Sequence, residues 1–372
     1  MKILDYPLFQ QLISEEALIC LTMYIPVGKE VSDVSSNMLR LKNLVKEVKS
    51  NNNHDPQINT ILQSVEHKLE DTELFKGYEG CIGFFVSTSG FFETVYLPAC
   101  SDTFYHIDQV FYIVPLIDLI PNLKQYFILS LAKNSVRLYR GDFYGLEEVT
   151  LVSEVPRSMQ EALGTELTDN HLHAAAGGSA TLHGYMEITD EKEVDNERFF
   201  RVIDNAIYEH YSKQENLPLY LATISENLHT FKKISKNPYL AKEHIEISAK
   251  TASTSDLHRA IKEIITNQQT HELHKIIELF YIAKNKDLTS EQLSQVAQNV
   301  IDARVAQLFL GKGRKIYGDV LLEERTIKID PNSQKDILNR LAILAYKSGS
   351  TTHIVHPKDL LLNEGAAAII RS

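Results

Sequence analysis

The chain has 372 residues, of which 44% are hydrophobic and 23% charged, an ordinary globular composition that excludes a wholly disordered protein. Single cores rarely grow past about 250–300 residues, so two or three domains are expected. The formal net charge of −11 excludes a general DNA-coating protein, but allows a factor that fits one RNA-rich site through local basic patches.

The sequence shows neither a secretory signal nor an apolar run near the roughly 18 residues of a membrane span. We therefore expect a cytoplasmic protein with no membrane or DNA partner. Its three cysteines, Cys20, Cys81 and Cys100, form no CxxC pair, and two lie in apolar, strand-like stretches. Buried free thiols in a reducing cytosol are the expected state.

Residues 1–121 are predicted to form an N-terminal α/β domain. The apolar pattern predicts a buried strand, two amphipathic helices and a hairpin turning at Thr88-Ser89-Gly90. These elements are the strand Ala17–Val27, the helices Val34–Lys49 and Ile58–Leu69, and the paired strands Gly80–Ser87 and Phe91–Leu97.

Residues 122–267 are predicted to form a middle domain that opens with a small sheet. Periodicity is lost between residues 155 and 190, and a structureless stretch of this length is usually functional or disordered. The expected elements are the strands Tyr126–Leu131, Ser135–Tyr139 and Glu147–Val152, the helix Asn196–Tyr211, the parallel-type strand Leu217–Ile224 and the helix Ser253–Glu263.

Residues 268–372 are predicted to form a C-terminal α/β domain. The fold class is thus mixed α/β, with three modules, of which the middle and C-terminal ones are mixed-sheet sandwiches. The C-terminal elements are the helices Gln268–Lys286, Thr289–Asp302 and Gln334–Ser348, and the strands Val305–Leu310, Thr352–His356 and Gly365–Ile370.

No motif indicates a nucleotide, metal or triad enzyme. Gly311-Lys312-Gly313 is too short for a Walker loop and predicts a turn, and the sequence has neither GxSxG nor HExxH. His171 and His173 would share a strand face, but no cysteine or acidic cluster completes a metal site. We expect no cofactor and no metal.

Two groups of basic residues are candidates for contact with RNA. One group lies along the predicted hairpin of the middle domain, and the other flanks the strand Val305–Leu310. An exposed, solvated surface is the alternative for both. The groups are Lys133, Arg137 and Arg140, and Arg304, Lys312, Arg314 and Lys315.

The most informative local feature is Gly177-Gly178-Ser179-Ala180, within the aperiodic stretch. Adjacent glycines allow the backbone to reach positive φ and to approach a ligand closely. The pair follows a small sheet and precedes the helix with the aromatic face.

This order of elements resembles the archaeo-eukaryotic peptide-chain release factor 1 superfamily, which includes Pelota, and most closely its bacterial branch, which includes the hibernation factor Balon. The resemblance covers nearly the whole chain. It rests on Leu129–Arg140 (LSLAKNSVRLYR), Arg198–Asp204 (RFFRVID), His183-Gly184 and the closing strand Gly365–Arg371 (GAAAIIR).

The resemblance implies a ribosome-associated factor that binds in the A-site region. In the superfamily a Gly-Gly-Gln loop reaches the peptidyl-transferase centre, where its Gln places water at the ester carbonyl. Ser179 follows Gly178 here, which implies a non-hydrolytic role in ribosome hibernation or rescue. The implied partners are rRNA, tRNA and, through the C-terminal domain, a translational GTPase, and the implied state is a monomer.

Two alternatives remain open. The first is a peptidyl-tRNA hydrolase, with His183 as general base and the amides of Gly177–Ala180 as oxyanion donors. The second is an interaction module of the same fold that no longer binds the ribosome, which the acidic net charge favours.

Overall fold

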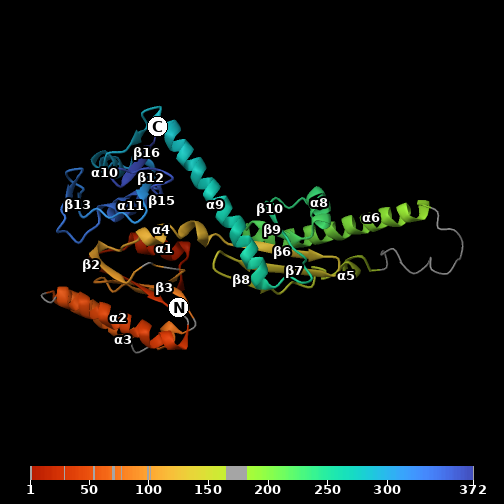
Figure 1. Cartoon of the computed structure of the whole chain (residues 1–372), viewed down its shortest axis with the longest axis horizontal. Helices are drawn as coiled ribbons and strands as arrows, with labels where there is room; N and C mark the ends of the chain where they lie inside the picture. The colour runs from red at the N-terminus through yellow and green to blue at the C-terminus, as the bar shows by residue number, and fades with distance from the viewer. Residues whose placement is uncertain are drawn as a thin grey trace. The chain divides into compact units, whose positions relative to one another are not determined.

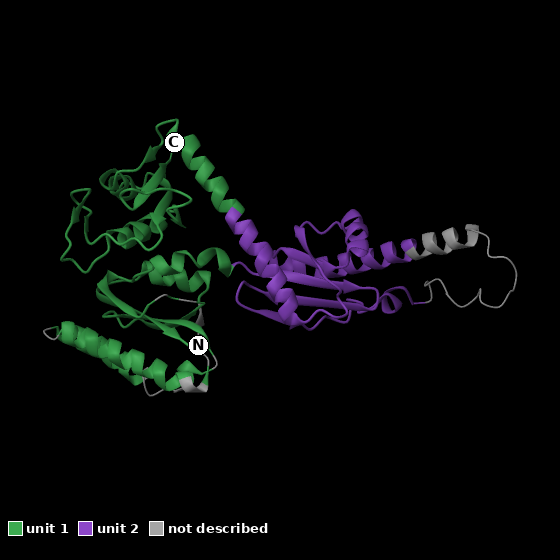
Figure 2. Ribbon diagram, viewed as in Figure 1, with its two compact units in different colours: residues 1–123, 271–372 green, residues 124–270 purple. Residues whose placement is uncertain are grey.

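The structure, a computed structural model, describes residues 2–28, 30–52, 55–68, 72–76, 78–98, 100, 102–164 and 182–371. Contacts divide it into two units: residues 1–123 together with 271–372, and residues 124–270 (Figure 2). Helices and strands are mixed in both units, so the predicted α/β class is confirmed. The division into three domains stays a prediction. None of the helices in the described part of the chain is long and apolar enough to cross a membrane.

The first part of unit 1 is a five-stranded sheet in the order β1-β4-β3-β2-β5 (Figure 1). Side chains of β2 alternate between two cores, because successive residues of a strand point to opposite faces. Leu21 and Met23 pack with α2 and α3, whereas Cys20 and Tyr24 pack with α1 and the last third of the chain. The elements are β1 Lys2–Ile3, α1 Tyr6–Ser14, β2 Glu16–Val27, α2 Val31–Asn51, α3 Pro56–Lys68, β3 Gly80–Ser87, β4 Phe92–Leu97, β5 Phe104–Val110 and α4 Val114–Ile117.

The second part of unit 1 is a four-stranded sheet in the order β11-β16-β12-β15, with the separate hairpin β13–β14. β12 is parallel to β15 and antiparallel to β16. α11 buries Leu338 and Leu341 in the core that it shares with α1 and α4, so both ends of the chain complete one hydrophobic core. The elements are β11 Thr289–Ser290, α10 Leu293–Ile301, β12 Val305–Gly311, β13 Gly318–Leu321, β14 Thr326–Ile329, α11 Ile337–Lys347, β15 Thr351–Val355 and β16 Ala366–Ile370.

Unit 2 is a five-stranded sheet in the order β10-β9-β6-β7-β8, with helices on both faces. β9 is parallel to both β6 and β10, as its continuous apolar sequence predicts. α6 and α8 cover one face, and the first half of α9 covers the other. The elements are β6 Tyr126–Ala132, β7 Ser135–Gly141, β8 Leu146–Val149, α5 Met159–Leu163, α6 Leu182–Ile207, a π-helical turn Tyr208–Ser212, α7 Lys213–Glu215, β9 Leu219–Thr223, α8 Ser225–Ile234, β10 Leu240–Glu246 and α9 Thr254–Lys284.

The prediction of two helices between residues 253 and 286 is wrong, because α9 is continuous from Thr254 to Lys284. The polar stretch around Gln268 interrupts the apolar pattern, but it contains neither glycine nor proline, so the helix continues. The helix begins at Thr254, within one residue of the predicted start at Ser253. The Ser253 hydroxyl oxygen accepts a hydrogen bond from the Asp256 amide at 3.1 Å, and an Asp256 carboxylate oxygen accepts one from the Ser253 amide at 3.2 Å.

The aperiodic stretch is shorter than the predicted 155–190. α5 lies within it, and α6 begins at Leu182 instead of at Asn196. The sequence hides this start, because Gly184 and the charged residues that follow give no apolar stripe. Similarly, the predicted helix Thr289–Asp302 is the short strand β11 followed by α10.

The cysteine prediction is also wrong in part. Cys81 and Cys100 form a disulfide with a Cα–Cα distance of 5.5 Å, and Cys20 is the free, buried thiol. Antiparallel pairing places Cys81 opposite Leu97, so the chain that leaves β4 passes close to it. A separation of 19 residues does not reveal this contact in the sequence.

Candidate functional site

The segment that carries Gly177, Gly178, Ser179 and Ala180 lies outside the described residues, as do His171 and His173, but both of its stems are described. We call α5 and the turn before it the leading stem. Ser158 caps α5 by accepting a hydrogen bond from the Glu161 amide at 3.2 Å. The Met159 amide donates to the Lys133 carbonyl oxygen at 2.7 Å, which fixes the leading stem to the turn between β6 and β7.

The following stem is α6, which packs on the sheet through its C-terminal half. Phe199, Phe200 and Ile203 are fully buried there. Asp204, only 3% exposed, accepts hydrogen bonds from the Ser235 hydroxyl at 2.5 Å and from the Lys236 amide at 2.7 Å. The body of unit 2 therefore holds both stems. His183 lies in the first turn of α6, and its side chain is outside the described residues.

Two of the three predicted hairpin cations already have partners within unit 2. Arg137 donates to the Ala249 carbonyl oxygen at 2.5 Å. Arg140 forms an ion pair with Glu215 at 2.8 Å and a hydrogen bond with Gln125 at 2.9 Å. The ammonium group of Lys133 is exposed and has no ion-pair partner in the described part of the chain. Lys133 is therefore the most accessible cation of this group.

A cavity of about 520 Å³ lies beside the leading stem. It is lined by Ser135 and Arg137 from β7, by Thr150 directly after β8 and by Arg157 from the stem. Arg157 is exposed, and its guanidinium is unpaired among the described residues. Sequence reasoning did not select Arg157 as a site residue, although it is the one lysine or arginine between residues 155 and 190.

The structure separates the second basic group, which was predicted as one cluster. Arg304 precedes β12 and the other three follow it, so the length of a seven-residue strand, about 23 Å, lies between them. Lys312 pairs with Asp118 at 3.0 Å, and the Lys315 ammonium lies 4.6 Å from the centroid of the Phe104 ring. Arg314 donates to the Asn363 carbonyl oxygen at 3.5 Å. Gly313 has a φ of +71°, which agrees with the predicted turn.

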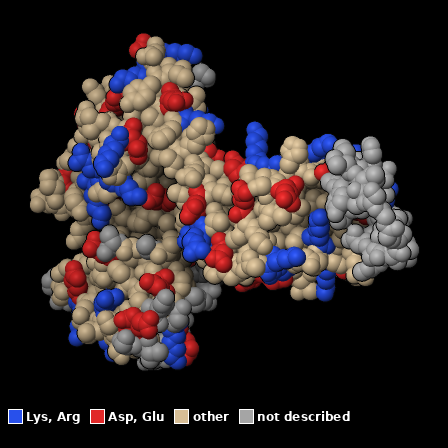
Figure 3. Space-filling view, turned by 45° about the vertical axis from the view of Figure 1, so that its right-hand side comes forward, with Lys and Arg blue, Asp and Glu red and all other residues tan. Residues whose placement is uncertain are grey.

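Charge on the molecular surface is mixed. On the face in Figure 3, cationic and anionic side chains alternate over the described residues. In the described part of the chain, no group of histidine, cysteine, aspartate and glutamate side chains is placed to hold a metal ion.

Comparison with known proteins gives a match in the middle of the chain. Residues 124–267 match the model of bacterial archaeo-eukaryotic release factor family 6, and this range lies within unit 2. No curated protein matches the chain.

The similar solved structures include several archaeal proteins. The chain is 13% identical to an archaeal translation termination factor, over 98% of this chain and 96% of that one, with a TM-score of 0.23. It is 15% identical to ribosome-bound archaeal Pelota, over 76% and 72%, with a TM-score of 0.41. It is also 15% identical to Archaeoglobus fulgidus Pelota, over 78% and 79%, with a TM-score of 0.34.

Proposed function

We propose that the protein is a ribosome-associated translation factor that acts in the A-site region, because its residues 124–267 match the model of bacterial archaeo-eukaryotic release factor family 6. The match over residues 124–267 is the observation that carries the proposal. The same range holds the paired stems of the diglycine segment. In this proposal unit 2 is a rigid support for both stems, and Gly177–Ala180 is the part that enters the ribosome.

The proposed role is non-hydrolytic. The superfamily's reaction depends on a glutamine after the glycine pair, and this chain has Ser179 there. The serine hydroxyl lies on a much shorter side chain than the glutamine amide, so it does not place water at the same point. Hibernation or rescue of idle ribosomes is the corresponding physiological role, and the C-terminal segment would contact a translational GTPase.

Lys133 and Arg157 are the proposed RNA contacts beside the leading stem. Both are exposed, and neither has an ion-pair partner among the described residues. An unpaired cation contributes more binding free energy with a phosphate than a cation already paired with a carboxylate, because its binding breaks no existing ion pair. Arg137 and Arg140, which were predicted with Lys133, would instead support the fold of this surface.

Co-sedimentation of the purified protein with bacterial ribosomes at physiological salt tests the proposal. We expect retention at micromolar concentration, and weaker retention of the double variant Lys133→Glu, Arg157→Glu. The matched control is Lys236→Glu, Lys242→Glu, which makes the same charge change on exposed side chains of unit 2. Absence of wild-type retention would remove the proposal, and equal losses in both variants would remove the assignment of these two contacts.

Release of labelled peptide from peptidyl-tRNA tests the non-hydrolytic role separately. We expect no release by the wild-type protein on ribosomes that retain it. Release that is lost in His183→Ala but kept in Arg304→Ala would instead identify a hydrolase.

A further inference from the structure

The cavity of about 520 Å³ beside the leading stem has a lining with net positive charge. Its charged side chains are two guanidiniums and one carboxylate, those of Arg137, Arg157 and Glu148, so the formal net charge of the lining is +1. An amide and two hydroxyl groups add neutral hydrogen-bond donors, from Asn134, Ser135 and Thr150. The lining is therefore suited to an anion that has several acceptor oxygens.

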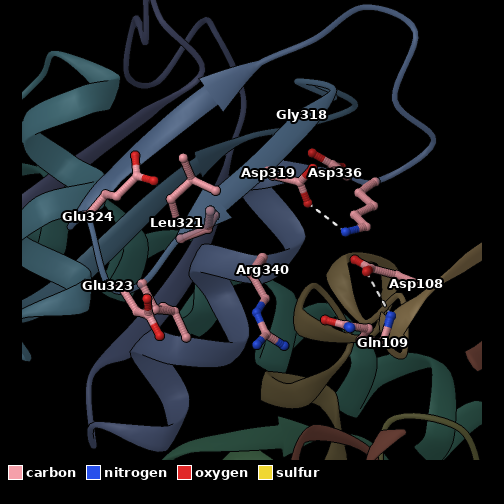
Figure 4. Close-up of a pocket in the computed structure, with 12 residues that line it drawn as sticks. Asp108, Gln109, Gly318, Asp319, Leu321, Glu323, Glu324, Asp336 and Arg340 are labelled. Atoms are coloured by element: carbon pink, nitrogen blue, oxygen red, sulfur yellow. Dashed lines mark hydrogen bonds and ion pairs between the residues drawn. The ribbon is translucent and has the colours of Figure 1, made fainter. Parts of the chain in front are cut away.

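A cavity of about 320 Å³ in unit 1, where β5, the hairpin β13–β14 and α11 meet, has the opposite charge (Figure 4). Its cations are Lys335 and Arg340, and its five carboxylates belong to Asp108, Asp319, Glu323, Glu324 and Asp336. Lys335 pairs with Asp319 at 2.6 Å, and Arg340 pairs with Glu16 at 2.7 Å. The excess of carboxylates repels anions, so of these two cavities the one in unit 2 is suited to an anion.

Arg137 is held at the wall of the unit 2 cavity without a carboxylate partner among the described residues. Its Nη2 donates to the Ala249 carbonyl oxygen at 2.5 Å, and its Nε is buried and has no acceptor there. Glu148 lies diagonally across from Arg137 on β8, because Tyr139 is the residue opposite Glu148. No ion pair joins the two within the described part of the chain. The positive charge of Arg137 is therefore fixed and uncompensated.

The backbone of Arg157 fixes this residue beside the cavity. Its carbonyl oxygen accepts a hydrogen bond from the Val136 amide at 2.9 Å, and its amide donates to a Glu161 carboxylate oxygen at 2.8 Å. Its side chain is exposed, and the guanidinium has no ion-pair partner among the described residues. Two uncompensated guanidiniums at one cavity repel each other, and a bound anion would offset that repulsion.

We propose that the unit 2 cavity binds one phosphodiester group of an RNA backbone, an inference that rests on the proposed function for its choice of RNA. Arg157 would donate to the non-bridging oxygens, and Arg137 would supply a fixed positive charge. Glu148 acts against more highly charged anions, because its repulsion grows with the charge of the ligand. A phosphate monoester carries roughly 1.5–2 negative charges at neutral pH, more than a phosphodiester. Glu148 therefore reduces the preference for free or terminal phosphates that two arginines alone would give.

Binding of the dinucleotide UpU, which contains a single phosphodiester, to the full-length protein tests the proposal. Amide resonances of Ser135 and Thr150 report occupation of the cavity during the titration. We expect saturable shifts with UpU and none with its methylphosphonate analogue, which has nearly the same shape without the charge. Uridine 3′-monophosphate, the comparison for a free phosphate, should bind no more tightly than UpU.

Variants of Arg157 locate the binding. Arg157→Gln should raise the Kd for UpU by about tenfold, as expected for loss of a charge-assisted hydrogen bond, and Arg157→Lys should restore part of that loss. The control Arg201→Gln removes an exposed charge of unit 2 that already pairs with Glu197. It should leave the Kd within about twofold of the wild-type value.

Glu148→Gln tests the selective role of this carboxylate. It should lower the Kd for uridine 3′-monophosphate by about three- to tenfold, and the Kd for UpU by less. The control is Glu147→Gln, because Glu147 is also exposed and adjoins Glu148 but points to the other face of β8. It should change neither Kd by more than about twofold. Equal effects of the two variants would contradict the role of Glu148.

Other results would overturn the assignment of the cavity. Absence of saturable shifts with UpU, or equal binding of the methylphosphonate, would exclude recognition of a charged phosphodiester. Tighter binding of uridine 3′-monophosphate than of UpU would identify a site for free phosphate instead. If ribosomes retain the protein, these outcomes leave the proposed function standing. Conversely, UpU binding that depends on Arg157, in a protein that ribosomes do not retain, would support the cavity and remove the ribosomal role.

Discussion

Asn339 Oδ1 accepts a hydrogen bond from the Ile113 amide at 2.8 Å, although the two residues are 226 positions apart. Its amide nitrogen also donates to the Phe111 carbonyl oxygen at 3.0 Å. Asn339 is fully buried, so one side chain satisfies two backbone groups that water cannot reach. Within unit 1, this amide joins α11 to the chain that leaves β5.

Replacing Asn339 with leucine should therefore destabilise unit 1. The change leaves a buried N–H and a buried carbonyl without partners, at an expected cost of about 2–5 kcal/mol in the free energy of unfolding. Urea denaturation followed by circular dichroism measures it. Asn332→Leu, in an exposed turn, is the control and should change little. A loss below about 0.5 kcal/mol in Asn339→Leu would contradict this account of the contact.

Asp204 is expected to hold the chain after α8. Asp204→Ala removes the acceptor of the Ser235 hydroxyl and of the Lys236 amide, and should cost about 1.5–3 kcal/mol. Amide hydrogen exchange should accelerate at Lys236 and Tyr239 more than at the buried strand β9. Glu243→Ala, on the exposed part of β10, is the control. Equal exchange in both variants would show that Asp204 does not fix this turn.

Acid should weaken unit 1 through two buried histidines. Burial lowers the pKa of both His106 and His353 from 6.5 to about 4, with a smaller effect of Lys315 on His106. Between these pH values the unfolded chain binds more protons than the folded one. The free energy of unfolding therefore falls as the pH drops through this range, by at most about 1.4 kcal/mol per pH unit for each group. Burial raises the pKa of Asp108 and Asp336 above 3.8, which opposes the trend in the acid part of the same range.

Urea titrations at several pH values within that range measure the slope. His106→Phe and His353→Phe should each make it shallower, and the double variant should make it shallower still. A double variant that keeps the wild-type slope would assign the acid sensitivity to other groups.

The disulfide predicts a definite thiol count. Without reductant, the denatured protein should expose one reactive thiol, Cys20, and after reduction it should expose three. Reduction should lower the free energy of unfolding by about 3 kcal/mol, as for other loops of this length. Cys20→Ser should give no reactive thiol before reduction. Three thiols in the untreated protein would show that Cys81 and Cys100 are not joined.

Elements with a strong local pattern could be predicted from the sequence. β2 and β9 are apolar along their length, and the hairpin β6–β7 has a recognisable turn. β10 was missed because LAKEHIE, at the edge of its sheet, exposes most of its charged side chains and has one fully buried residue, Ile245. The hairpin β13–β14 was missed because its strands are short and mostly only half-buried, so they show no clear apolar pattern.

The candidate sites were harder to predict, because they depend on long-range contacts. The sequence indicates that Arg140 is basic, but not that Glu215 pairs with it. It places Arg304 and Lys312 eight positions apart, but the strand between them keeps them separate. The cavity lined by residues 108–109 and 318–340 was not predicted at all, since these residues come from two distant parts of the sequence.

Unit 1 is assembled from the two ends of the chain, and this has a consequence for biosynthesis. The last third of the chain supplies α11, which covers the face of the first sheet that carries Tyr24. While a nascent chain grows, that face stays uncovered until the final hundred or so residues emerge, whereas unit 2 is complete earlier. Premature arrest after residue 270 would therefore leave a folded unit 2 attached to an incomplete unit 1. The uncovered apolar face of the incomplete unit would be prone to aggregation and to binding by chaperones.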